Sequence, residues 1–213
     1  MKQKLIAELV GTALLLAIIT GSGIMGASLS EANTAVALLG NSIATGCGLY
    51  VLISLLEPIS GAHFNPAVSL MFWRNGALSS NQVLAYIAMQ IIGAVVGVWL
   101  THAIFGMEIL QTSMHDRGGL NQMLSELVST LVLLSVIKLG VKNASEKIPM
   151  LVALTVTAGY WFTSSTFFAN PAVTMARSLT NTFVGIAPAD IAGFIAAQLV
   201  AVLLMSLLIG KHK

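Results

Sequence analysis

Two copies of the tripeptide Asn-Pro-Ala are the residues of this chain with the most specific chemistry. They are Asn65-Pro66-Ala67 and Asn170-Pro171-Ala172. Each copy opens a short apolar stretch, at Pro66–Trp73 and Pro171–Leu179, which is too short to cross a membrane. Proline is favoured in the first turn of a helix because its missing N–H costs nothing there. We therefore expect two half-helices that enter a membrane and stop midway.

The N-termini of two such half-helices would meet at the membrane centre if they entered from opposite faces. Each N-terminus carries about half a positive charge and several unpaired N–H donors, so the centre repels cations and admits neutral molecules. Asn65 and Asn170 stand at the cap positions, where their amides can offer donors to a passing oxygen. Ala67 and Ala172 keep the crossing point small. A single Asn-Pro is also a common loop turn, but two copies in matching positions favour a pore.

Two glutamates interrupt apolar runs at matching places. An acid within a membrane span costs about 2.5–3.5 kcal/mol on insertion scales, so Glu8 and Glu126 need a reason to be there. One interpretation is a relay of protons or ions, and the other is structural support. Their repetition at equivalent positions favours support. His63 has the same two interpretations, packing of a loop or titration inside the pore.

The elements that must position these residues are membrane helices. Hydrophobic residues make up 56% of the 213 residues and charged residues 8%, against about 25% charged in soluble domains. The chain therefore needs lipid as its solvent. The N-terminal stretch resembles a signal peptide, but Glu8 interrupts it, and we take it as a retained span; Cys47 is expected to be a buried thiol within a span. The expected spans are Leu5–Gly23, Ala35–Leu56, Gln82–Phe105, Leu120–Leu139, Ile148–Thr163 and Ala189–Gly210.

An internal repeat organises these spans into two halves. The order of a Glu motif, an Asn-Pro-Ala motif and a Gln occurs twice, with Gln90 and Gln198 as the last members. Each half holds three spans, an odd number, so the second copy must be inverted relative to the first. Inverted repeats with broken helices are a transport architecture. We expect one all-α membrane domain over residues 1–213, with six transmembrane helices and two re-entrant half-helices in half-repeats of approximately 1–112 and 113–213.

The basic residues predict the orientation. Threading six spans puts eight Lys and Arg residues on one side, which the positive-inside rule assigns to the cytoplasm. We therefore expect both termini to be cytoplasmic in a multi-pass protein of the inner (plasma) membrane. The formal net charge of +2 is too small to indicate a nucleic-acid partner. The eight are Lys2, Lys4, Arg74, Lys138, Lys142, Lys147, Lys211 and Lys213, whereas Arg117 and Arg177 lie opposite or within the second re-entrant segment.

The segment Gly61–Val68 and the second motif at Asn170–Ala172 resemble the two signature loops of the aquaporin and aquaglyceroporin family. The resemblance covers essentially the whole chain. It implies a homotetramer in the lipid bilayer with one pore per subunit, no cofactor or metal, and no enzymatic activity. It also implies that Glu8 and Glu126 brace the re-entrant loops by accepting backbone N–H bonds, with His63, Gln90 and Gln198 as further loop-bracing residues. We expect the two glutamines to bond loop carbonyls.

The resemblance also assigns a selectivity filter. Water-selective members of the family narrow the outer pore with an aromatic residue, a His and an Arg that follows the second motif. Spacing from the motifs puts Thr45, Ala158, Phe167 and Val173 at the filter positions, with Gly159 as the alternative to Ala158. Arg177 lies one helical turn beyond Val173, and its guanidinium can either reach back to the filter or line the outer vestibule.

These substitutions predict a wide and apolar filter. We therefore expect a passive channel for water together with glycerol-like polyols, excluding ions and protons. The second motif, from Asn170 to Arg177, also resembles a bacterial subgroup associated with metalloid detoxification, which adds neutral acids such as arsenite. A strict water channel and a proton-coupled secondary transporter remain the alternatives. An intramembrane enzyme is disfavoured because no nucleophile motif frames the serines or His63.

Overall fold

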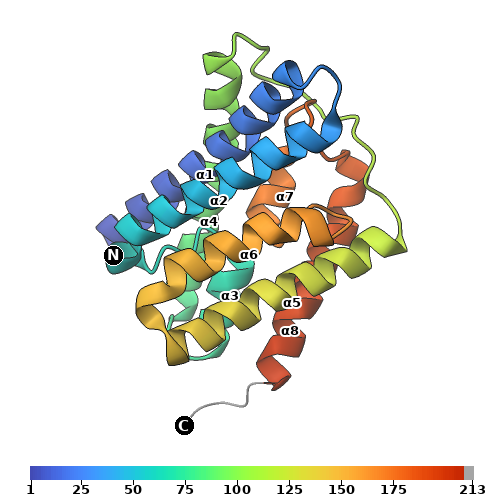
Figure 1. Ribbon diagram of the computed structural model, residues 1–213. Coiled ribbons are helices and arrows are strands. Elements are labelled where there is room, and N and C mark those ends of the chain that lie inside the picture. The colour runs from blue at the N-terminus through green and yellow to red at the C-terminus, as the bar shows by residue number, and fades with distance from the viewer. Residues whose placement is uncertain (209–213) are drawn as a thin grey trace.

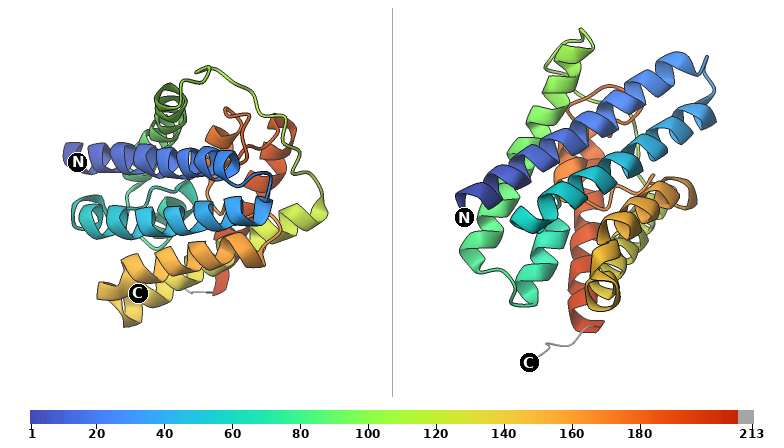
Figure 2. Two further views of the ribbon diagram at one scale, coloured as in Figure 1. Left: turned by 45° about the horizontal axis from the view of Figure 1, so that its top comes forward. Right: turned by 60° about the vertical axis from the view of Figure 1, so that its left-hand side comes forward.

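A computed structural model describes residues 1–208. The regular elements of this part of the chain are all helices, and it contains no strand. Eight α-helices and two short 3₁₀ turns form one bundle (Figure 1). α1, α2 and α6 lie side by side across it, as both views of Figure 2 show. The elements are α1 (Lys2–Leu29), α2 (Thr34–Ser60), α3 (Pro66–Arg74), α4 (Ser80–Ile104), α5 (Leu120–Asn143), η1 (Ser145–Lys147), α6 (Ile148–Phe162), α7 (Pro171–Arg177), η2 (Pro188–Asp190) and α8 (Ile191–Leu208).

Five of the six expected spans are long and apolar enough to cross a bilayer, namely α1, α2, α4, α5 and the segment Pro188–Leu207. The fifth expected span is α6, which has 15 residues. At 1.5 Å per residue it covers roughly 22 Å, less than the ~30 Å of a hydrocarbon core. α1 and α2 extend past their predicted ends because hydropathy marks only the lipid-immersed part of a helix. The all-helical membrane fold is confirmed.

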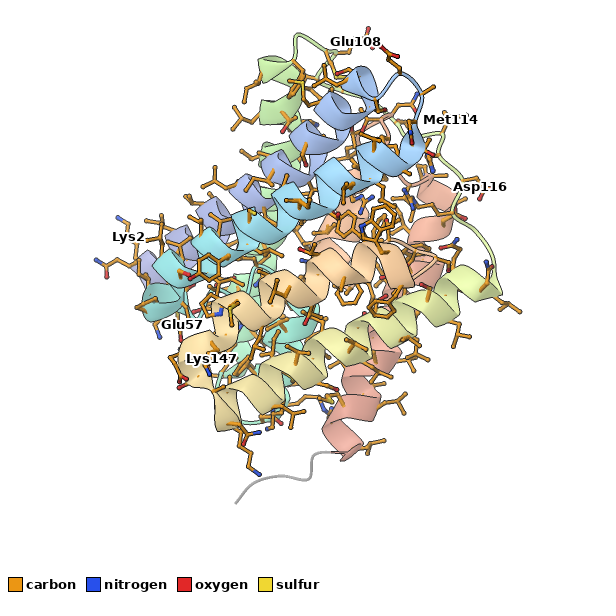
Figure 3. All side chains as sticks on the ribbon, viewed as in Figure 1. Lys2, Glu57, Glu108, Met114, Asp116 and Lys147 are labelled. Carbon is orange, nitrogen blue, oxygen red and sulfur yellow. The ribbon has the colours of Figure 1, made fainter. Side chains whose placement is uncertain are left out.

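Exposed polar residues mark the two ends of the bundle. Figure 3 shows Lys2, Glu57 and Lys147 at one end and Glu108, Met114 and Asp116 at the other. We call the first the lysine end, and the second the loop end because it carries the connection 105–119 between α4 and α5. Of the basic residues used to predict the orientation, Lys211 and Lys213 lie outside the described residues.

Two glycines let α1 and α4 approach closely. A Cβ on Gly93 would lie 2.3 Å from the carbonyl oxygen of Leu9, and one on Gly97 would lie 2.2 Å from that of Ala13. Both contacts are with backbone, which has no flexible end to move aside. Small residues at these two positions therefore allow the close packing of α1 against α4.

Replacement of Gly97 by Leu is expected to force α1 and α4 apart and to destabilise the fold. Overpacking of this kind costs about 1–3 kcal/mol, so the midpoint of thermal unfolding in detergent should fall by several degrees. Gly40→Leu is the matched control, because a Cβ on Gly40 of α2 meets no atom within 4 Å. Equal midpoints for the two variants would contradict the assigned helix contact.

The half-helices α3 and α7 lie near the middle of the bundle (Figure 1). Each begins at the proline of an Asn-Pro-Ala motif, and each is capped by the preceding asparagine. The Asn65 side chain accepts from Ala67 N, and the Asn170 side chain accepts from the N–H groups of the second and third residues of α7. The two expected half-helices are thus present, with their N-termini inside the protein.

The expectation that Cys47 is a buried thiol is wrong. Its thiol is exposed on the surface of the chain and not buried. Membrane helices are apolar on the lipid side as well as on the packed side, so composition does not tell which side a small apolar residue takes.

Candidate pore

The two half-helices bind each other's entry loops through their cap asparagines. Asn65 Nδ2 donates to the Ala169 carbonyl at 2.7 Å, and Asn170 Nδ2 donates to the Phe64 carbonyl at 2.8 Å. Each amide carries two N–H donors, so one donor of each asparagine is left for another acceptor. The opposed N-termini of α3 and α7 are therefore tied together at one point, and both asparagines line the cavity that passes it.

Glu8 and Glu126 hold the two entry loops in matching ways. Both carboxylates are fully buried, and neither lines the central cavity or the second cavity that are described below. Each accepts two consecutive backbone N–H groups of one loop. For Glu8 these belong to His63 (3.0 Å) and Phe64 (2.8 Å), and for Glu126 to Phe168 (3.0 Å) and Ala169 (2.9 Å).

These bonds stabilise a strained backbone. Phe64 and Ala169 both have a φ of +47°, in the left-handed region. A non-glycine residue there costs on the order of 1–3 kcal/mol and persists only when its surroundings hold it. Both are held twice, since their N–H groups bind a glutamate and their carbonyls accept from Asn170 and Asn65.

The two glutamines do not bond loop carbonyls as expected. Gln90 Nε2 donates to Glu8 Oε2 at 2.8 Å and to Ser69 Oγ at 2.9 Å. Gln198 Nε2 donates to Glu126 Oε2 at 2.6 Å and to Thr174 Oγ1 at 2.9 Å. The reason is the buried carboxylate, which is a stronger acceptor than a carbonyl. The glutamines thus link each glutamate to the half-helix of its own repeat.

A central cavity of about 310 Å³ runs from the lysine end past the two asparagines. Among the described residues, Glu57 is the acidic group on its wall. The wall is mostly aliphatic, so the charge of an ion would be poorly solvated along it. The aliphatic side chains include Leu15, Ile19, Leu49, Ile53, Leu133, Ile137, Val152 and Val156.

His63 lies on this wall and also packs against the bundle. Its ring stacks on Phe72 with 4.7 Å between centroids, and its Nδ1 lies 3.0 Å from Ser69 Oγ. These contacts support the interpretation that His63 packs the loop. The ring also borders the central cavity.

Three of the residues assigned to the filter line the central cavity together. They are Thr45, Phe167 and Val173, which are all buried. Ala158 does not join them, and its assignment is wrong. It is exposed on the outer side of α6. Consecutive side chains of a helix point about 100° apart, so an error of one or two positions in the assignment moves a residue to another side of the helix. Gly159, which follows Ala158, is buried, and a Cβ there would lie 2.2 Å from the Phe167 ring.

Tyr160 is a wall residue that the spacing argument missed. It is buried, it lines the central cavity, and its hydroxyl lies 3.2 Å from Thr45 Oγ1. An aromatic side chain from α6 therefore stands beside the small Thr45 of α2. The signal in the sequence was the aromatic residue two positions beyond Ala158.

Arg177 lies on the wall of the central cavity and on the wall of a second one. Its side chain is 2% exposed, its Nε donates to the Val184 carbonyl, and its guanidinium carbon lies 3.5 Å from the centre of the Phe168 ring. It lines both cavities. The side chain therefore borders both the cavity that contains Thr45, Phe167 and Val173 and the second cavity, and its place in the filter stays a prediction.

The second cavity opens at the loop end, and we call it the mouth cavity. Its volume is about 400 Å³, and its wall includes His115, Arg117, Trp161, Phe183 and Arg177. Burial lowers the pKa of Arg117 to about 10, which leaves it charged at neutral pH. Partial burial, followed by Arg117 and Arg177, lowers the pKa of His115 and favours the neutral ring. Within residues 1–208 no group of His, Cys, Asp and Glu could hold a metal ion.

Comparisons with known proteins agree on one family. The sequence pattern of the family described as "Major intrinsic protein" matches residues 1–167. The aquaglyceroporin AqpS of Rhizobium meliloti is 49% identical over 197 residues, which cover 92% of this chain and 84% of that protein. Aquaporin Z of Photorhabdus laumondii is 35% identical over 104 residues, or 49% of this chain and 44% of that protein.

A solved structure has the same fold. The aquaglyceroporin from Plasmodium falciparum superposes with a TM-score of 0.70 and covers 97% of this chain and 98% of its own. The sequence identity is 18%, so this likeness concerns the arrangement of the helices.

Proposed function

This chain belongs to the major intrinsic protein family, and from that premise we propose that it is a passive channel for water and small neutral solutes such as glycerol. The observation that carries the proposal is the meeting of two half-helix N-termini at the wall of the mostly apolar central cavity. The positive ends of α3 and α7 disfavour cations there, and the free N–H donors of Asn65 and Asn170 receive the oxygens of neutral solutes.

The filter supports a preference for solutes larger than water. Thr45 and Val173 are small, and Val173 stands where water-selective relatives have an arginine. Without that cation the opening between the wall side chains is wider and the wall offers fewer donors, so a polyol passes with less steric strain. We propose glycerol-like polyols and neutral trihydroxy metalloid acids such as arsenous acid as solutes, because both present several hydroxyl groups on a compact neutral body. A strict water channel is disfavoured for the same reason.

A proton-coupled transporter is disfavoured by the bonding of the buried acids. Coupling needs a carboxylate that reaches the solute and exchanges a proton. Glu8 and Glu126 are turned away from the cavities and are occupied by loop N–H groups and glutamines. Their bonding therefore supports the bracing function.

The chain is a multi-pass membrane protein, and the finer arrangement is part of the proposal. We propose a homotetramer in the bacterial inner membrane with both termini in the cytoplasm. The lysines of the lysine end support that orientation. Exposed leucines, isoleucines and valines on α1, α2, α4, α5 and α6 supply surface for lipid and for neighbouring subunits.

Proteoliposomes containing the full chain are expected to reswell in glycerol and in arsenous acid gradients at rates that follow the solute gradient alone. An imposed pH gradient should leave these rates unchanged, because Glu8 and Glu126 are held by loop N–H groups and glutamines, and Glu57 on the cavity wall lies at the lysine end (Figure 3) and not beside the two asparagines. Stopped-flow light scattering measures the fluxes, and empty liposomes are the control. Proton or sodium currents comparable with the solute flux would contradict a passive neutral channel.

A further inference from the structure

The two arginines of the mouth cavity use only part of their donors. The Nε of Arg177 donates to the Val184 carbonyl, and the Nε of Arg117 donates to the Gly185 carbonyl at 2.7 Å. Their terminal nitrogens donate to no protein atom among residues 1–208. Both arginines line the mouth cavity, so these donors are available to a molecule bound there.

These two cations also lack a carboxylate partner in the described part of the chain. Their side-chain bonds go to backbone carbonyls. The nearby Asp190 accepts the backbone N–H of Arg117 at 2.8 Å, and Asp116 accepts that of Gly118. Neither aspartate lines the mouth cavity. Partly buried cations of like sign repel each other, so the cavity favours an anion between them.

The spacing of the arginines suits a small oxyanion. Both guanidinium carbons lie over one ring, that of Phe168, at 5.2 Å for Arg117 and 3.5 Å for Arg177. The two carbons are therefore separated by no more than those distances combined. A separation within this limit lets one tetrahedral oxyanion, placed beside the ring, accept N–H···O contacts of about 2.8 Å from both guanidinium groups.

We propose that the mouth cavity binds a small oxyanion such as phosphate or sulfate between Arg117 and Arg177, and that the bound anion obstructs solute entry from the loop end. Arg177 lines both cavities, so an occupant at its guanidinium lies next to the central cavity as well as in the mouth cavity. The planar fork of each arginine can offer paired N–H donors to the oxygens, whereas chloride offers no such geometry. The anion bound at this site regulates the channel, and it is not one of the neutral solutes proposed above.

Binding is tested on the purified full chain in detergent by isothermal titration with sodium phosphate, against sodium chloride at equal ionic strength. Phosphate should bind saturably and chloride should not. Arg117→Gln should weaken phosphate binding by about tenfold or more, the loss expected when one charge-assisted pair is removed. Arg117→Lys keeps the charge and should recover only part of the affinity. Arg74→Gln, at the exposed end of α3, should bind like the wild type.

The flux arm uses proteoliposomes with phosphate on the loop-end side only. Glycerol flux should fall as phosphate approaches saturation, and it should not fall when phosphate is on the lysine-end side or when the variant is Arg117→Gln. Absence of saturable phosphate binding, or equal binding in Arg117→Gln and Arg74→Gln, would overturn the proposal. Binding without an effect on flux would overturn the obstruction. Because the binding arm needs no transport, a chain that conducts no glycerol would refute the channel function and leave the anion site standing.

Discussion

Val173→Arg is expected to lower glycerol flux by about tenfold or more, while water flux falls by much less. Val173 is 4% exposed, lies on the central cavity wall and shares that wall with Thr45 and Tyr160. An arginine there adds bulk and fixed donors to this part of the cavity wall. A water molecule can exchange its hydrogen bonds with the new guanidinium, whereas a polyol must also fit past it. An added barrier of about 1.4 kcal/mol already corresponds to a tenfold slower passage.

The measurement is the ratio of glycerol to water flux in proteoliposomes of equal channel content. Val173→Leu is the matched control, since it adds bulk without donors and should change the ratio less. Equal loss of both fluxes in Val173→Arg would show plain blockage at this position. An unchanged ratio would place Val173 outside the solute path.

Glu126→Ala should abolish most of the folded protein. The carboxylate accepts from Phe168 N, from Ala169 N and from Gln198 Nε2, at 3.0, 2.9 and 2.6 Å. Alanine would leave these buried donors without a partner, at a cost of about 1–3 kcal/mol each. Their combined loss is comparable with the total stability of about 5–15 kcal/mol of a typical domain. It would also release the left-handed Ala169.

The yield of monodisperse protein after membrane extraction measures this effect. Glu126→Gln keeps the shape and one oxygen acceptor, so it should give an intermediate yield. Glu146→Ala, in the exposed turn η1, removes an acid that braces nothing and should give a normal yield. A Glu126→Ala protein that folds normally and loses only proton-dependent uptake would support a transporter instead.

The sequence alone determined the membrane class, the helices and the two half-helices. Apolar runs, prolines in a first helical turn and asparagine caps are local properties, and they place Asn65 and Asn170 at the half-helix starts without knowledge of distant residues. The repeat of the same motif order in both halves also predicted matching surroundings for Glu8 and Glu126, since equal motifs in equal order give equal contacts. The predicted ends of the spans were less exact, because hydropathy marks only the part of a helix that lies in the lipid.

Only the tertiary structure decided which side chains face the pore. Consecutive helical residues point about 100° apart, so a shift of two positions separates the exposed Ala158 from Tyr160 on the cavity wall. Arg117 comes from the connection 105–119 and reaches the Phe168 ring by folding back over the bundle, which no local pattern encodes. The position of Arg177 on the walls of both cavities is also not encoded locally. This position depends on how the half-helix α7 packs between helices that are far apart in the chain.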